Sequence, residues 1–136
     1  NKIIEYAEKY KNILFYKRVN YEEALKIQKK SDLIYAMYYK TIKNHIYAAP
    51  NKFYESLFLE VPLITTAGTL VGEMTKKFNL GFVIDEGYDN LNNFLNNKNA
   101  IYELLPKYKN NLKKLWEIKY KNYINIYMEN TYFKLL

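Results

Sequence analysis

The chain has 136 residues, the size of one ordinary domain, and its 49% apolar and 26% charged residues are typical of a globular chain with a core. It contains no cysteine, which excludes disulfide frameworks, cysteine-bound zinc and thiol nucleophiles. Its single histidine, His45, excludes a His-rich metal site. The net charge of +7 comes from lysines and one arginine, Arg18. Arginine is preferred for bidentate recognition of phosphate and guanine, so its scarcity argues against a dedicated nucleic-acid binder.

The first half of the chain alternates helical and strand patterns. Apolar spacing predicts a helix over residues 2–11, and the apolar run at 13–16 has the length of a short strand. Asn20 is predicted to cap a helix over 21–30, with Glu23 at the capping-box position. A second strand is predicted over 33–38, followed by a polar loop over 39–49.

The second half continues the alternation. Pro50 is expected in the first turn of a helix over 51–60, before a strand at 62–66. A turn at 67–69, a helix over 70–78 and a strand at 81–85 follow. The remainder is predicted to be helical, over 88–97 and over 100–132 with an interruption near Pro106. Strands joined by helices indicate βαβ units, and hence a parallel sheet of about four strands with helices on both faces.

The C-terminal helices are expected to carry an apolar stripe, partly exposed beyond Tyr120. Residues 101–136 hold seven lysines against three glutamates, so this third of the chain could lie against an anionic membrane surface or simply be solvated. The stripe consists of Leu104, Leu105, Leu112, Leu115, Trp116, Tyr123, Ile124 and Tyr127.

No apolar run approaches the roughly 18 residues that span a bilayer, and the chain opens on Asn1 without a signal peptide. We therefore expect a cytoplasmic protein, or one held at the inner face of the plasma membrane, and a piece of a longer chain.

The loops after the strands, at 16–20, 38–52 and 67–72, are the expected ligand sites, because ligands bind at the carboxyl ends of parallel strands. The helix beginning after Pro50 offers free backbone N–H groups to an anion. The positive charge of Lys52 is unfavourable beside the positive end of the helix dipole, unless a bound diphosphate makes that interaction favourable. Glu55, one turn further on, could accept hydrogen bonds from two sugar hydroxyls. The alternative is that Glu55 completes ordinary capping and that Lys52 is solvated.

An ordered set of motifs carries a resemblance over residues 13–132. The chain resembles the C-terminal domain of the GT-B glycosyltransferases, closest to the large retaining family that builds bacterial surface polysaccharides such as capsule. The resemblance implies a Rossmann-like sheet with a helical C-terminal extension. The matching motifs are Ser31-Asp32, Pro50-Asn51-Lys52-Phe53-Tyr54-Glu55, Val61-Pro62-Leu63-Ile64, Gly68-Thr69 with Gly72-Glu73, Gly81-Phe82-Val83, and Trp116 with residues 123–128.

The resemblance also implies roles for individual residues toward a nucleotide-sugar donor. Glu55 matches the glutamate that binds the ribose hydroxyls, and the backbone of Asn51 and Lys52 matches the helix start that holds the diphosphate. Arg18 and Val19 match the place where the backbone meets the nucleobase. Thr69, in the glycine turn, is the remaining donor-binding candidate. Such a domain uses no metal, because the helix dipole and basic side chains neutralise the leaving diphosphate.

Three residues depart from the family pattern. Tyr47 stands where the family often has a second glutamate, which puts the stereochemical class in doubt. Glu60 and Lys17 replace usual glycines. Because a left-handed conformation would cost a glutamate roughly 1 kcal/mol, the helix that precedes Glu60 is expected to end differently.

The other candidate residues each have an alternative, purely structural explanation. His45 could reach a substrate from its loop or simply be exposed, and Tyr38 or Tyr39 could stack on a sugar or base while the other joins the core. Trp116 and residues 120–127 are expected to pack between helices. Gly68 and Gly72 form no phosphate-binding P-loop, since no Gly-Lys-Ser/Thr follows them.

We therefore expect a partial domain, with residues 1–98 forming the nucleotide-sugar-binding part and 99–136 the C-terminal helices. A complete domain of this type would have six strands, so the chain alone is expected to be inactive and to need an N-terminal part that precedes it. The expected partners are a nucleotide-sugar donor and a glycan or lipid-linked acceptor. Two alternatives stay open: a nucleotide-sugar epimerase of the same fold, and a non-enzymatic basic α/β module that binds RNA or a protein.

Overall fold

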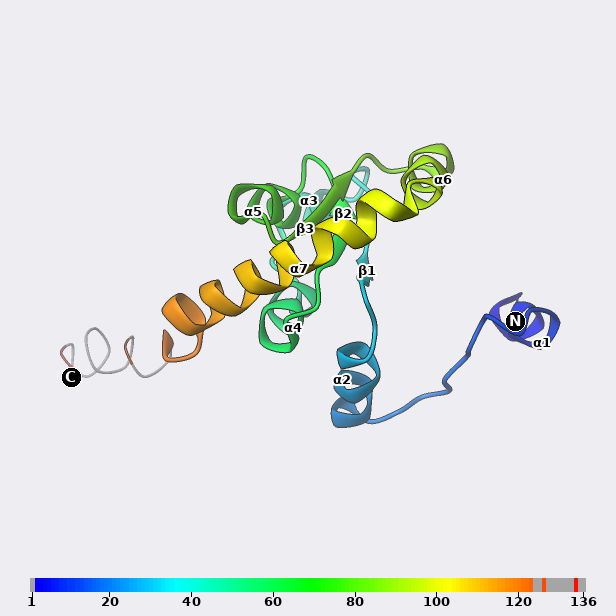
Figure 1. Ribbon diagram of the computed structural model, residues 1–136, viewed down its shortest axis with the longest axis horizontal. Coiled ribbons are helices and arrows are strands. Elements are labelled where there is room, and N and C mark those ends of the chain that lie inside the picture. Colours follow the sequence, from blue (N-terminus) through cyan, green and yellow to red (C-terminus); the bar gives the residue numbers. More distant parts are fainter. Residues whose placement is uncertain (1, 124–125, 127–133, 135–136) are drawn as a thin grey trace.

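The computed structural model describes residues 2–123, 126 and 134 (Figure 1). From α2 to α6 the strands are separated by helices, as the sequence predicts, and a five-residue π-helix follows the longest described helix. The elements are α1 (Lys2–Lys9), α2 (Tyr21–Lys29), β1 (Ile34–Ala36), α3 (Lys43–Tyr47), α4 (Asn51–Leu59), β2 (Leu63–Thr66), α5 (Leu70–Phe78), β3 (Gly81–Ile84), α6 (Tyr88–Asn96), α7 (Lys98–Leu115) and the π-helix η1 (Trp116–Tyr120).

In the described part of the chain the sheet has three parallel strands in the order β1-β2-β3. The parallel α/β architecture is confirmed, but the prediction of a strand at residues 13–16 is wrong. That segment runs from α1 to α2 away from the sheet (Figure 1), and Leu14 in it is 74% exposed. Its apolar composition suits a strand, but a strand needs a hydrogen-bonding neighbour, and residues 13–16 do not pair with β1, which stays at the edge of the sheet.

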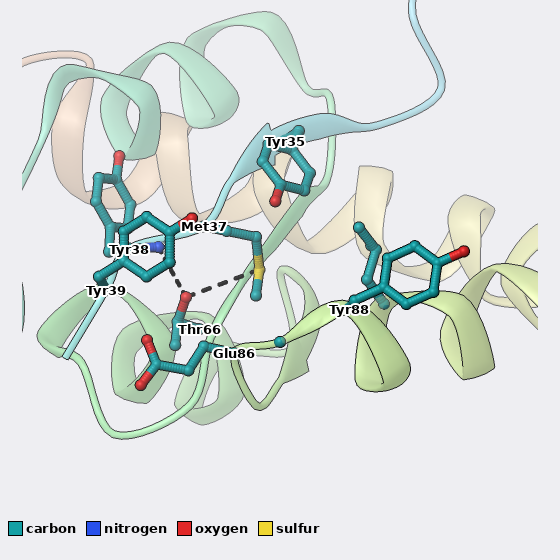
Figure 2. A pocket seen from close by; sticks show the side chains of 9 residues that line it. Tyr35, Met37, Tyr38, Tyr39, Thr66, Glu86 and Tyr88 are labelled. Atoms are coloured by element: carbon teal, nitrogen blue, oxygen red, sulfur yellow. Dashed lines mark hydrogen bonds between the residues drawn. The ribbon is translucent and has the colours of Figure 1, made fainter. Parts of the chain in front are cut away.

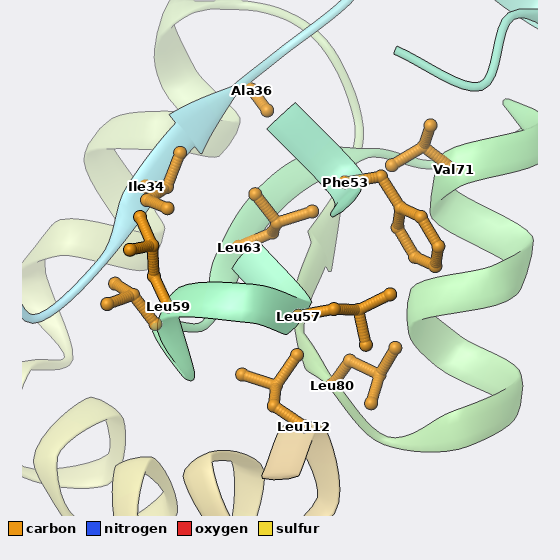
Figure 3. Packing of buried hydrophobic residues seen from close by; sticks show 10 residues of the cluster. Ile34, Ala36, Phe53, Leu57, Leu59, Leu63, Val71, Leu80 and Leu112 are labelled. Atoms are coloured by element: carbon orange, nitrogen blue, oxygen red, sulfur yellow. The ribbon is translucent and has the colours of Figure 1, made fainter. Parts of the chain in front are cut away.

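The hydrophobic core lies on one face of the sheet, between the strands and helices α4, α5 and α7 (Figure 3). Leu57 of α4, Leu63 of β2 and Leu112 of α7 are fully buried at its centre. The core cluster is Ile34, Ala36, Phe53, Leu57, Leu59, Val61, Leu63, Val71, Leu80 and Leu112.

Two glycines allow the close packing around β2. A Cβ at Gly81 would lie 2.2 Å from the backbone oxygen of Leu63, and one at Gly72 would lie 2.3 Å from that of Thr66. Both contacts are with backbone atoms and far shorter than van der Waals distance, so β3 and α5 approach β2 this closely only with glycine at these positions.

One predicted helix end is confirmed by the structure and another is wrong. The Oδ1 of Asn20 accepts from the backbone N–H of Glu23 at 2.8 Å, which confirms the predicted cap of α2. The expectation that α4 avoids a left-handed end at Glu60 is wrong, since Glu60 has φ 58° and ψ 33°. Hydrogen bonds hold this end: the Val61 N–H donates to the Ser56 oxygen at 3.1 Å, and the Ser56 hydroxyl donates to the Val61 oxygen at 2.6 Å.

Two further expectations about the helices are corrected. The predicted loop at 39–49 contains the short helix α3, and α7 continues through Pro106 without interruption. Pro106 is exposed, as is Tyr102 four residues before it, so water can reach the carbonyl that loses its partner there.

Trp116 of the apolar stripe and Tyr120, which is not part of it, pack against α4 through two pairs of rings. Trp116 meets Phe58 with ring centroids 5.4 Å apart, and Tyr120 meets Tyr54 at 5.9 Å. The packing role expected for Trp116 is therefore confirmed. Tyr123 is 54% exposed, in agreement with the expected exposure beyond Tyr120, whereas Ile124 and Tyr127 lie outside the described residues.

Candidate functional site

The first residues of α2 and α4 line a common cavity of about 370 Å³. Tyr21 opens α2 and Asn51 opens α4, and Glu55, one turn into α4, lies between them. The two helices pack against each other. The remainder of the lining is formed by Leu25, Tyr54, Phe58 and Trp116.

Glu55 is a carboxylate with only 5% of its surface exposed. Such a group is costly to bury without partners, and two are present. The Lys52 Nζ lies 2.5 Å from its Oε2, and Tyr21 lies close enough to interact with the same carboxylate. Partial desolvation, followed by the negative charge of Glu55, raises the pKa of Tyr21 above its ordinary value, so the phenol stays a donor.

Lys52 connects the two helices as well as neutralising Glu55. Its Nζ lies 3.3 Å from the Gln28 Oε1 of α2, and its side chain is 43% exposed. The ammonium group therefore sits at the surface end of a buried charge pair, from which it can turn toward a ligand. Glu55 would then have acceptor capacity free for hydroxyl groups.

The other predicted donor-binding residues divide into those near this site and those apart from it. Val19 is half-buried and shares a neighbouring groove with Lys52 and Gln28, beside the edge of β1. Arg18 is exposed and lines neither the cavity nor the groove. Tyr47, which replaces the family's second glutamate, is 77% exposed at the end of α3.

Thr69 has a structural place rather than a place in the cavity. It is 1% exposed and caps α5, where its hydroxyl accepts from the Gly72 N–H at 3.0 Å. The same hydroxyl donates to the Thr66 oxygen at 2.8 Å. Its single proton is thus used within the turn between β2 and α5.

A second cavity, of about 280 Å³, opens at the carboxyl ends of β1 and β2 (Figure 2). Both tyrosines singled out from the sequence line it: Tyr38 is half-buried and Tyr39 is 67% exposed. Burial, followed by the charge of Glu55, raises the pKa of Tyr38. His45 packs edge-on against Tyr38, at 5.6 Å between ring centroids, and does not line the cavity.

Sequence reasoning missed Tyr21 and Gln28, the two residues of α2 that contact the Glu55–Lys52 pair. The cap at Asn20 locates the start of α2, but nothing in the sequence says which residues of that helix face α4. Their role depends on the packing of two helices separated by β1 and α3 in the chain.

Neither a metal cluster nor a membrane-spanning helix is found where the chain is described. No three His, Asp or Glu side chains there are grouped so as to hold a metal ion. Within the same residues, none of the helices combines the length and the apolar character needed to cross a bilayer.

Fold and site together define an α/β protein with a small parallel sheet and a buried, lysine-paired carboxylate where two helices begin. Comparisons with models of protein families, with curated proteins and with solved structures find no match to this chain.

Proposed function

We propose that the chain is the donor-binding part of a glycosyltransferase, which uses a nucleotide-diphosphate sugar to extend a surface-polysaccharide or glycolipid acceptor. The observation that carries the proposal is Glu55, a nearly buried carboxylate one turn into α4, held by a lysine that can move. Glu55 also lines an open cavity, where a ligand can reach it.

The diphosphate is assigned to the start of α4. Pro50 precedes this helix without a side-chain hydrogen bond to its N–H groups, and its first turn has no acidic residue. The partial positive charge at the helix start is therefore available to an anion. With a diphosphate bound at the Asn51 and Lys52 backbone, the Lys52 ammonium turns to the phosphate oxygens, since two negative groups now compete for it.

Release of Lys52 frees Glu55 for the ribose. The carboxylate accepts from two adjacent hydroxyls, while the Tyr21 hydroxyl keeps its orientation fixed. The proposal assigns the nucleobase to the backbone of Arg18 and Val19, just before α2, although the Arg18 side chain lines neither the cavity nor the groove. In this proposal the helix dipole and Lys52 neutralise the leaving diphosphate, and no metal takes part.

The proposal includes partners beyond this chain. An N-terminal part of the same protein holds the acceptor and supplies further contacts to the diphosphate, so the chain alone binds the donor weakly and does not transfer sugar. The reaction takes place in the cytoplasm, where the basic C-terminal third can bring the protein to the inner face of the plasma membrane.

Calorimetric titration with UDP, GDP, ADP and dTDP tests the donor site. At least one of these nucleotides should bind, and Glu55→Gln should weaken its binding by about 1–3 kcal/mol because a charge-assisted acceptor pair is lost. Glu73→Gln is the matched control, an exposed glutamate in the first turn of α5. Equal affinity of the wild type and Glu55→Gln for the nucleotide would contradict the assignment.

A further inference from the structure

The cavity at the carboxyl ends of β1 and β2 has features that the donor site does not use. Three exposed tyrosine rings surround it: Tyr35 on β1, Tyr39 in the following loop and Tyr88 at the start of α6, which are 62%, 67% and 80% exposed. Figure 2 shows these rings around Met37 and Thr66. Tyr35 and Tyr39 belong to β1 and the loop directly after it, whereas Tyr88 begins α6, so the fold brings two separate segments together here.

Hydrogen bonds hold the residues at the base of the cavity, whereas the tyrosines at its rim are exposed. The Thr66 hydroxyl accepts from the Tyr38 N–H at 2.8 Å and contacts the Met37 sulfur at 3.7 Å, which ties the end of β1 to β2. Glu86 accepts from the Lys40 N–H at 3.1 Å. A rigid base beneath aromatic rings is the arrangement of a preformed ligand site.

The charge of the lining selects against anionic ligands. Glu86 is the charged residue among those that line the cavity, and the Lys40 ammonium nearby is paired with Asp85 at 3.4 Å. A phosphate or an anionic headgroup would meet a carboxylate and no free cation among the lining residues. A neutral ligand rich in hydroxyl groups meets an acceptor instead, because a carboxylate has about four lone-pair sites and the backbone of Lys40 uses one of them.

We infer that this cavity is a binding site for a neutral sugar residue of a glycan, stacked on Tyr35 and Tyr88 and hydrogen-bonded through its hydroxyls to Glu86. Its volume of about 280 Å³ is at the lower end of ordinary ligand pockets, which suits one sugar ring with the rest of the glycan outside. The apolar face of a pyranose packs on a tyrosine ring, while its hydroxyls reach the polar rim.

This site is separate from the proposed donor site. Its lining shares no residue with the cavity around Glu55. A glycan here and a nucleotide at α4 can therefore be bound together. The inference does not rest on the donor assignment.

Calorimetric titration with neutral trisaccharides of α-linked glucose, β-linked glucose, mannose and N-acetylglucosamine tests this inference. At least one should bind at millimolar concentration, and Tyr35→Ala and Tyr88→Ala should each weaken its binding about tenfold. Tyr102→Ala is the matched control, because Tyr102 is 59% exposed on α7 and does not line the cavity. Glu55→Gln should leave trisaccharide binding unchanged, which separates this site from the donor site.

Several results would overturn the inference. They are the absence of binding by all four trisaccharides, equal affinity of Tyr35→Ala, Tyr88→Ala and the wild type, or an equal loss in Tyr102→Ala. Displacement of the bound trisaccharide by a thymidine decanucleotide would show instead that the tyrosines bind nucleobases.

Discussion

The N-terminal segment and the sheet region use the same kinds of apolar residue with opposite results. In α1 and residues 13–16, isoleucine, leucine and tyrosine side chains stay exposed, as in Ile3 at 57% and Leu14 at 74%, and α1 buries no residue. In α4 and β2, Leu57 and Leu63 are fully buried. The two regions differ in their surroundings more than in composition. Residues 13–16 do not pair with β1, which stays an edge of the sheet, and nothing in the described part of the chain covers the N-terminal segment.

The largest expected effect comes from making the same substitution in both regions. Leu57→Ala should lower the free energy of unfolding by about 2–5 kcal/mol, since it leaves a cavity in the core. Leu14→Ala should change the free energy of unfolding by less than about 0.5 kcal/mol, because the side chain is exposed. Urea denaturation followed by circular dichroism measures both. A loss of comparable size in Leu14→Ala would show that residues 13–16 pack in solution and would remove the contrast.

A smaller effect is expected at the end of α4, within the well-packed region. Glu60→Gly should raise the free energy of unfolding by up to about 1 kcal/mol, because glycine adopts the left-handed conformation without the cost that a Cβ imposes. Asn79→Gly is the control: Asn79 ends α5 with φ 52°, and asparagine tolerates this conformation better than glutamate. An equal gain from both substitutions would mean that Glu60 carries no particular strain.

The smallest effect concerns alkaline pH. Burial against Phe82 raises the pKa of Tyr108 above 10.0, so the folded state holds the phenolic proton more tightly than the unfolded state. The resulting stability is fully present below about pH 10 and is lost as the pH rises from there through the raised pKa. Tyr108→Phe should therefore flatten the fall in melting temperature above pH 10, whereas Tyr102→Phe, at an exposed position, should not. Identical melting curves for Tyr108→Phe and the wild type would refute this cause.

Local signals in the sequence predict most of the elements. The cap at Asn20 and the start of α4 after Pro50 are determined by residues close in the chain. The strand at 13–16 is wrong because strand formation depends on a neighbour that no local pattern reports. Likewise, α7 passes Pro106 because that residue lies on an exposed surface, which depends on how the helix packs.

The candidate site can be predicted in part, where its residues lie close together in the chain. Asn51, Lys52 and Glu55 share one helical turn, so their proximity follows from helix geometry. Tyr21 and Gln28 reach Glu55 and Lys52 only through the packing of α2 on α4, and Thr69 turns out to be a helix cap. The tyrosines around the second cavity converge from two segments, residues 35–39 and the start of α6, and single-sequence patterns do not bring such segments together.

Backbone amide shifts during a titration with nucleoside diphosphates test the central claim most directly. The donor assignment predicts that the amide signals of Asn51 and Lys52 move when the diphosphate is added and move far less with the corresponding nucleoside, because the phosphates bind at the start of α4. Shifts confined to other regions, or equal shifts with the nucleoside and its diphosphate, would contradict the assignment of α4 as the diphosphate site.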